Sequence, residues 1–284
     1  MSGSPERYLF GGCRMRVCIE GEEADDQLSL IEGYLPSGAD TGVHVRVGED
    51  QVLYLVAGEV ELTVGGERVP VRGGESFFIP RNLPHRVRNF GVGEARALLV
   101  VSAEQYSSVM LVPPYQEGEA VFTGKPPIYK RPVHKKQQDS YMFFGVPMVL
   151  HLAGIETGNE FSLIESYMGV DGDSGLHMHA NEDECIYVLD GELQLTVGDS
   201  VFVLRTGCSY FIPRHCAHRL RSCKAARVMH WYTPGTLDPF VRMAGIRIKG
   251  PNDVGPAYPS PEQIGPILLL SEEYDFQMLV PPGA

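Results

Sequence analysis

Four residues in the second half of the chain have types and spacings that could bind a metal ion. His177 and His179 are two positions apart, so on a β-strand their side chains would point to the same face. Glu184 follows after a short turn, and His218 comes from a later strand. Three imidazoles and one carboxylate that converge form a site suited to Fe²⁺, Mn²⁺, Ni²⁺, Cu²⁺, Co²⁺ or Zn²⁺. The sequence therefore predicts a divalent metal centre on these four residues.

An internal repeat supplies the elements that would position these ligands. Residues 29–34 read SLIEGY and residues 162–167 read SLIESY, an offset of 133 positions. The same offset aligns residues 8–89 with residues 141–222 without a gap, with about 33 identities in 82 positions. This identity is far above what unrelated segments share, so the chain contains a duplicated domain.

Each copy has the pattern of a β-domain. Short apolar or alternating runs bounded by Gly and Pro predict strands. Gly65-Gly66 and Gly198-Asp199 predict hairpin turns. Strands of this length and spacing predict an all-β fold, a sandwich or a small barrel. The predicted strands are residues 53–56, 59–64 and 76–79 in the first copy, and 186–189, 192–197 and 209–212 in the second.

Composition excludes several classes of function. The chain has 284 residues and a formal net charge of −12, which disfavours nucleic-acid binding. With 43% hydrophobic and 21% charged residues, it has the composition of a globular protein. No apolar stretch approaches the roughly 18 residues that a membrane span needs. The six cysteines form no CxxC pair, and residues 1–10 lack the apolar core of a secretory signal, so we expect a cytoplasmic protein.

The second copy contains an insertion that the first lacks. Residues 106–114 and 274–282 both end in MLVPP, but they are 168 positions apart, so 35 residues have been added in between. The insertion spans roughly residues 234–270, and its beginning, residues 237–243, predicts a short helix. Because long loops in compact domains are often functional, two interpretations are open. The segment is either a surface excursion or a lid at the mouth of the second domain.

Both copies resemble the cupin family. The first cupin motif is matched by Gly172, His177, His179, Glu184 and Gly191, and the second by Gly207, Pro213 and His218. The resemblance implies two tandem jelly-roll β-barrels with short helices and a C-terminal arm. We expect an N-terminal barrel over 1–114, a linker over 115–140 that includes the basic run Lys130–Lys136, and a C-terminal barrel over 141–284.

The first copy has lost part of the ligand set. Arginine does not deprotonate and so places a permanent cation at a ligand position, and glutamine lacks the negative charge of glutamate. We therefore predict one divalent metal per chain, in the C-terminal barrel. The N-terminal barrel would serve stability, an interface or solubility; an anion or carboxylate pocket, or a partly ligated metal, are the alternatives. The residues of this degenerate site, in the order of their counterparts in the second copy, are His44, Arg46, Gln51 and His85.

The resemblance also implies a chemistry. Residues 232–240 look like the corresponding segment of the quercetin 2,3-dioxygenase-like bicupins, in which the glutamate of the first motif is both ligand and base. Glu184 would then be a catalytic residue that takes the substrate proton. This implies a metal-dependent dioxygenase acting on a flavonol- or polyketide-like aromatic or enolisable small molecule. A non-redox polyketide cyclase or isomerase and a non-catalytic small-molecule-binding bicupin are the alternatives, because the fold does not fix the function.

We expect a largely apolar substrate pocket beside the metal. Strand residues that share parity with Glu184 should face inward, and the last strand of the barrel should add a wall. His215 and His230 are interpreted as ordinary histidines, with a pocket role left open. The oligomeric state is open as well, with a homodimer among the options. The predicted pocket residues are Ile186, Val188, Met229 and Trp231.

Overall fold

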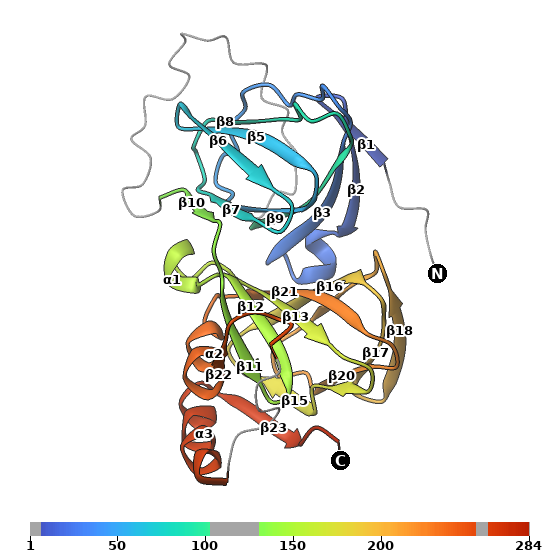
Figure 1. Cartoon of the computed structure of the whole chain (residues 1–284), viewed down its shortest axis with the longest axis vertical. Coiled ribbons are helices and arrows are strands. Elements are labelled where there is room, and N and C mark those ends of the chain that lie inside the picture. The colour runs from blue at the N-terminus through green and yellow to red at the C-terminus, as the bar shows by residue number, and fades with distance from the viewer. Residues whose placement is uncertain (1–6, 103–130, 254–260, 284) are drawn as a thin grey trace. The chain divides into compact units, whose positions relative to one another are not determined.

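The computed structural model describes residues 7–102, 131–253 and 261–283 (Figure 1). The chain divides into two compact units, Met1–Lys136 and Gln137–Ala284. Each unit contains two β-sheets, and every strand pair described within them is antiparallel. The structure confirms the prediction of a duplicated, all-β chain with short helices.

The N-terminal unit combines a large and a small sheet. The large sheet has the strand order β1-β2-β3-β9-β4-β7-β10, and the small sheet has the order β6-β5-β8. Leu55, Leu62 and Val71, all fully buried, belong to the hydrophobic core that strands of both sheets share. The elements are β1 (Arg7–Phe10), β2 (Cys13–Ile19), a 3-10 turn (Gly21–Ala24), β3 (Leu28–Leu35), β4 (Gln51–Ala57), β5 (Glu59–Val64), β6 (Glu67–Arg72), β7 (Ser76–Ile79), β8 (His85–Arg88), β9 (Ala95–Ser102) and β10 (Val133–Lys135).

The C-terminal unit repeats this arrangement and adds to it. One sheet has the order β19-β16-β21-β13-β12-β11-β22, and the other has the order β18-β17-β20-β15-β23, with β14 paired to β20. The elements are β11 (Asp139–Phe143), β12 (Val146–Leu152), α1 (Gly154–Thr157), β13 (Ser162–Met168), β14 (Gly172–Asp173), β15 (Leu176–His179), β16 (Asp183–Asp190), β17 (Glu192–Val197), β18 (Ser200–Arg205), β19 (Ser209–Ile212), β20 (His218–Ser222), β21 (Ala226–Thr233), α2 (Asp238–Ala244), β22 (Ile246–Ile248), α3 (Pro261–Glu273) and β23 (Phe276–Val280).

Alternation of side chains along the strands builds the core of this unit. In β17, Leu193 and Leu195 are buried while Gln194 between them is less so, as expected for a strand with one face toward the core. Gly191, between β16 and β17, has φ +90°, and a Cβ there would lie 2.2 Å from the Ala225 carbonyl oxygen. This turn therefore requires glycine.

The inserted segment is more structured than its Gly- and Pro-rich sequence indicated. The short helix predicted at 237–243 is present as α2, but β22 and the 13-residue α3 were not predicted. Within the expected linker, Val133–Lys135 forms β10, which pairs with β7. Residues 106–130, which include the first MLVPP segment, lie outside the described residues. No described helix is long and apolar enough to cross a membrane.

Candidate metal centre

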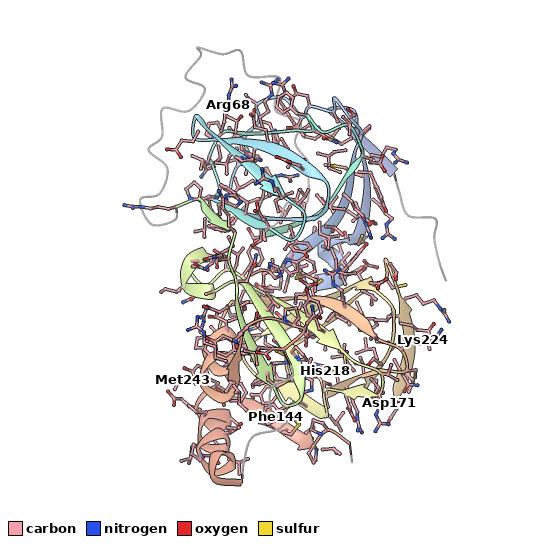
Figure 2. All side chains as sticks on the ribbon, in the orientation of Figure 1. Arg68, Phe144, Asp171, His218, Lys224 and Met243 are labelled. Atoms are coloured by element: carbon pink, nitrogen blue, oxygen red, sulfur yellow. The ribbon has the colours of Figure 1, made fainter. Side chains whose placement is uncertain are left out.

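Three neighbouring strands bring the predicted ligands together. His177 and His179 lie on β15, Glu184 is the second residue of β16, and His218 begins β20, where it pairs directly with His177. One ligand atom from each residue can be chosen so that all four lie within 4.8 Å of one another. All four side chains are buried, and Figure 2 shows His218 inside the ribbon of the C-terminal unit.

Backbone carbonyls orient two of the imidazoles. The Nδ1 atom of His177 lies 3.1 Å from the carbonyl oxygen of Gly175, and Nδ1 of His218 lies 3.0 Å from that of Cys216. Because a carbonyl only accepts a hydrogen bond, each Nδ1 carries the hydrogen and each Nε2 carries a lone pair. Both Nε2 atoms are therefore prepared to coordinate a cation.

The two carboxylate oxygens of Glu184 have different contacts. Oε1 accepts hydrogen bonds from Nδ1 of His230, at 2.6 Å, and from the Tyr232 hydroxyl, at 3.2 Å. The hydroxyl of Ser166 in turn donates to Nε2 of His230, at 2.7 Å. Oε2 lies 2.9 Å from Nε2 of His218 and 3.6 Å from Nε2 of His179. Oε1 is thus held by the protein, and Oε2 faces the imidazoles.

The electrostatics keep His177, His179 and Glu184 in their metal-binding protonation states. Burial and the neighbouring His218 and His179 imidazoles hold the pKa of His177 well below its usual range, and burial lowers the pKa of His179 to about 3. Burial raises the pKa of Glu184, but the close polar contacts with His218 and His230 outweigh it and hold the pKa well below the ordinary value. A neutral His177 and a neutral His179 beside an ionised Glu184 are the forms that bind metal.

Unsatisfied polar atoms test whether a metal fits these residues. Nε2 of His179, Nε2 of His218 and Oε2 of Glu184 are buried without a hydrogen-bond partner. Buried polar atoms seldom lack a partner, and these three face one another. A divalent cation would satisfy all three at once, so the donor set fits a metal ion.

The pocket beside the ligands is apolar and aromatic. It encloses about 530 Å³ of empty space, open solvent at its mouth included. No Lys or Arg is found among the described residues that line it. The lining consists of the ligands His177, His179 and Glu184, the polar residues Ser166, Ser174, His230 and Tyr232, and the apolar residues Phe143, Phe144, Val146, Met148, Met168, Leu220, Leu237, Phe276 and Met278.

The four pocket residues predicted from the sequence lie elsewhere. Ile186 and Val188 face inward as expected, but they belong to the hydrophobic core and not to the pocket lining. Met229 and Trp231 are fully buried and are also absent from the lining. In β21 the register pairs His230 with Ile186, so Met229 and Trp231 occupy the other face of the sheet.

His230 and Tyr232 are the functional candidates that sequence reasoning missed. His230, interpreted as an ordinary histidine with a pocket role left open, lines the pocket and holds Glu184. Alternation along β21 places residues 230 and 232 on one face, and the pairing of β21 with β16 shows that this is the face of Glu184. His215 does not line this pocket.

The insertion contributes to the pocket at one point. Leu237, which precedes α2, lines the pocket and is 3% exposed. Its neighbours Phe240 and Val241 on α2 are buried in the same hydrophobic cluster. This part of residues 234–270 therefore borders the metal pocket, as the lid interpretation requires. Residues 254–260 of the insertion lie outside the described residues.

The N-terminal unit keeps the pocket without the full ligand set. The ring centroids of His44 and His85 are 4.2 Å apart, the same separation as for His177 and His218. The side-chain amide nitrogen of Gln51 lies 3.3 Å from Nε2 of His85, and Gln51 occupies the position that Glu184 has in the other copy. All four residues of the degenerate site, His44, Arg46, Gln51 and His85, line one apolar pocket.

The partners of the glutamate are also replaced in this copy. The strand registers place Leu99 at the position of His230 and Val101 at that of Tyr232. Burial and the neighbouring His44 lower the pKa of His85 to about 3, so its imidazole is neutral. Among the described residues, the group that could hold a metal is the one in the C-terminal unit.

Comparison with known proteins is consistent with this geometry. The cupin domain family matches residues 31–101 and 165–233. Quercetin 2,3-dioxygenase from Bacillus subtilis is 22% identical over 321 residues, covering 99% of this chain and 94% of that protein. Polyketide synthase CurC of Streptomyces cyaneus is 34% identical over 59 residues, which is 21% of this chain. This match and two others of similar length cover 38% to 55% of those relatives.

Solved structures give the same fold. Oxalate decarboxylase from Bacillus subtilis superposes with a TM-score of 0.65 at 16% identity, covering 82% of this chain and 76% of that one. The formate complex of the Lactobacillus farciminis enzyme gives 0.65 at 15% identity, with 84% of that chain covered. The cupin domain occurs twice in the chain, one relative aligns with almost its whole length, and the oxalate decarboxylase structures have the same fold. The chain is therefore a bicupin that resembles the quercetin 2,3-dioxygenase-like proteins.

Proposed function

We propose that this chain is a metal-dependent dioxygenase whose substrate is a flat aromatic or enolisable small molecule, flavonol- or polyketide-like. The observation that carries the proposal is a buried three-histidine, one-glutamate cluster that opens into an aromatic, apolar pocket. The similarity to quercetin 2,3-dioxygenase over 99% of the chain supports the same reaction class. The metal ligands are His177, His179, Glu184 and His218.

The pocket chemistry favours this substrate class over a small dianion. Oxalate is small and doubly charged, and a Lys or Arg beside the metal would favour its binding through charge-assisted hydrogen bonds. The described lining residues include no Lys or Arg, whereas Phe143, Phe276 and Tyr232 offer ring surfaces. Aromatic side chains bind flat aromatic ligands by stacking and edge contacts. The oxalate decarboxylases therefore share the fold with this chain but do not indicate its substrate.

The protein's own residues would bind the substrate and handle its proton. A divalent metal, when bound, would polarise a substrate oxygen and, if redox-active, allow reaction with dioxygen. His230 and Tyr232 hold Oε1 of Glu184, so Oε2 would use one lone pair for the metal and the other to accept the hydroxyl proton of the substrate. Leu237 and Phe276 would cover the substrate and exclude water.

A metal-dependent polyketide cyclase or isomerase is the second candidate. The 59-residue similarity to polyketide synthase CurC favours this candidate, and the same four residues would bind the metal. In this case the metal would act as a Lewis acid only, and no dioxygen would be consumed.

Elemental analysis and oxygen uptake separate the two candidates. The protein would be purified without added metal, its metal content measured, and oxygen consumption recorded with flavonols and polyketide-type phenols. Iron, nickel, manganese or copper together with uptake supports the dioxygenase. Zinc, with conversion of the phenols but no uptake, supports the cyclase or isomerase and overturns the first proposal.

A further inference from the structure

A second carboxylate lies behind one of the metal ligands. Oε2 of Glu182 is 3.7 Å from Nδ1 of His179, and the two side chains are 2% and 3% exposed. Neither of these two atoms has a hydrogen-bond partner. Glu182 is not one of the four grouped ligands, so the cluster alone does not account for a buried carboxylate at this place.

The other two histidine ligands show what this carboxylate could do. The Nδ1 atoms of His177 and His218 are held by backbone carbonyls, which leaves their Nε2 atoms for the metal. Nδ1 of His179 has no hydrogen-bond partner, and the carboxylate of Glu182 faces it. We propose that Glu182 is the positioning residue of His179: it accepts the Nδ1 hydrogen and so directs Nε2 to the metal.

The inserted segment fixes this carboxylate. The Thr236 hydroxyl donates a hydrogen bond to Oε1 of Glu182, which leaves Oε2 toward His179. Thr236 follows Gly235, where a Cβ would lie only 2.3 Å from the backbone of Phe161. The amide of Gly235 also donates to the carbonyl of Asn159. The segment is therefore closely packed, and the hydroxyl that holds Glu182 has a defined position.

The N-terminal copy provides an internal comparison. Glu49 occupies the position of Glu182, and it pairs at 3.0 Å with Arg46, which occupies the position of His179. The carboxylate is thus present in both copies, three residues after the side chain it faces. In the first copy it neutralises a guanidinium, and in the second it faces an imidazole. In the second copy, Glu182 and Glu184 together would place two negative charges near a dication.

This inference rests on the proposed metal centre, and metal affinity tests it without reference to activity. We would measure the Kd of the metal-free protein for Co²⁺ and Zn²⁺ by competition with a chromophoric chelator. Glu182→Ala should weaken binding by about 10- to 100-fold, because the loss of such a partner typically has this effect. Glu182→Gln, which keeps an acceptor but not the charge, should fall between Glu182→Ala and the wild type. Thr236→Val should weaken binding by a smaller factor.

The visible spectrum of the Co²⁺ protein provides a readout that a purely structural role would not change. We expect Glu182→Ala to alter the ligand-field bands, because the His179 ring is no longer held. Glu49→Gln in the first copy is the matched control, with affinity and spectrum unchanged. The melting temperature of each metal-free variant identifies loss of the fold; Glu182→Gln and Thr236→Val still test the proposal if Glu182→Ala does not fold.

The outcomes separate this inference from the proposed function. Wild-type affinity and an unaltered Co²⁺ spectrum in the Glu182 variants would overturn the role of Glu182. If the Glu182 variants bind metal more weakly but the wild type consumes no oxygen with any phenol tested, the role of Glu182 is supported and the dioxygenase proposal is overturned. A wild-type protein that binds no metal at these histidines would overturn both.

Discussion

Glu184 shows how one side chain can be a ligand and remain fixed in place. Its Oε1 is occupied by His230 and Tyr232, so rotation of the carboxylate would break two buried hydrogen bonds. Only Oε2 then faces the three imidazoles. In the N-terminal copy the same strand positions hold Gln51, Leu99 and Val101, so both the ligand and its supports are replaced there.

A matched pair of substitutions tests the assignment of the ligands. His218→Ala should weaken metal binding by more than about 100-fold and abolish turnover, because it removes an anchored Nε2 donor. His85→Ala, at the same position of the first copy, should leave metal binding and turnover unchanged. Metal content by elemental analysis and oxygen uptake check this. Full activity of His218→Ala would show that the metal is not catalytic.

At the scale of single elements, Asp173 ties the ligand-bearing strand to the C-terminal arm. It accepts hydrogen bonds from Arg219, from the amide of Gly175 just before β15, and from the amide of Gly283 after β23. Burial raises the pKa of Asp173, but these donors outweigh it and hold the pKa well below its usual range. A carboxyl whose pKa is depressed in the folded state stabilises the fold when it is ionised.

This arrangement predicts a pH-dependent contribution to stability. Asp173→Asn should lower the free energy of unfolding by about 2 kcal/mol at pH 7, because charge-assisted hydrogen bonds are lost. The difference from the wild type should hold above pH about 4, the unfolded pKa of aspartate, and shrink as the pH falls toward the lower folded pKa. Urea unfolding at a series of pH values measures it. A difference that grows in acid would contradict the assignment.

Because the inserted segment contacts the pocket, a substitution in it should change substrate binding without changing the metal content. Leu237→Ala should raise KM for an aromatic substrate and leave the metal content unchanged, because the side chain lines the pocket but is no ligand. The buried cavity should also cost about 2–5 kcal/mol of stability. Val241→Ala, in the same cluster but outside the pocket lining, is the control. Loss of metal from Leu237→Ala would mean that the segment supports the barrel itself.

At the scale of the whole molecule, the duplicated sequence predicts how many metals the chain binds. We expect about one metal per chain. Because the His44 and His85 rings keep the separation seen in the intact site, Arg46→His combined with Gln51→Glu should raise the content toward two. Elemental analysis of the wild type and the double variant gives both numbers. Two metals in the wild type would show that the first barrel binds metal without the full set.

The repeat and the ligand spacings made most of the fold and the metal centre predictable, because both depend on local patterns. The pocket walls were harder to predict. Choosing between Trp231 and its neighbours His230 and Tyr232 required the strand register, which depends on pairing with β13 and β16. Helix α3 was missed because Gly265 and Pro266 disfavour a helix locally, and yet it forms. The role of Glu182 depends on Thr236, 54 positions away.

The pairing of β23 with β15 has a consequence for biosynthesis. All four ligand residues are translated by position 218, whereas Phe276 and Met278, which complete the pocket wall, follow about 60 residues later. Domains generally begin to fold while the chain is still being made. A nascent chain can therefore assemble the ligands before the wall that covers them exists. Metal could enter from the ribosome-bound stage onward, and the last strand would then close over a centre that is already loaded.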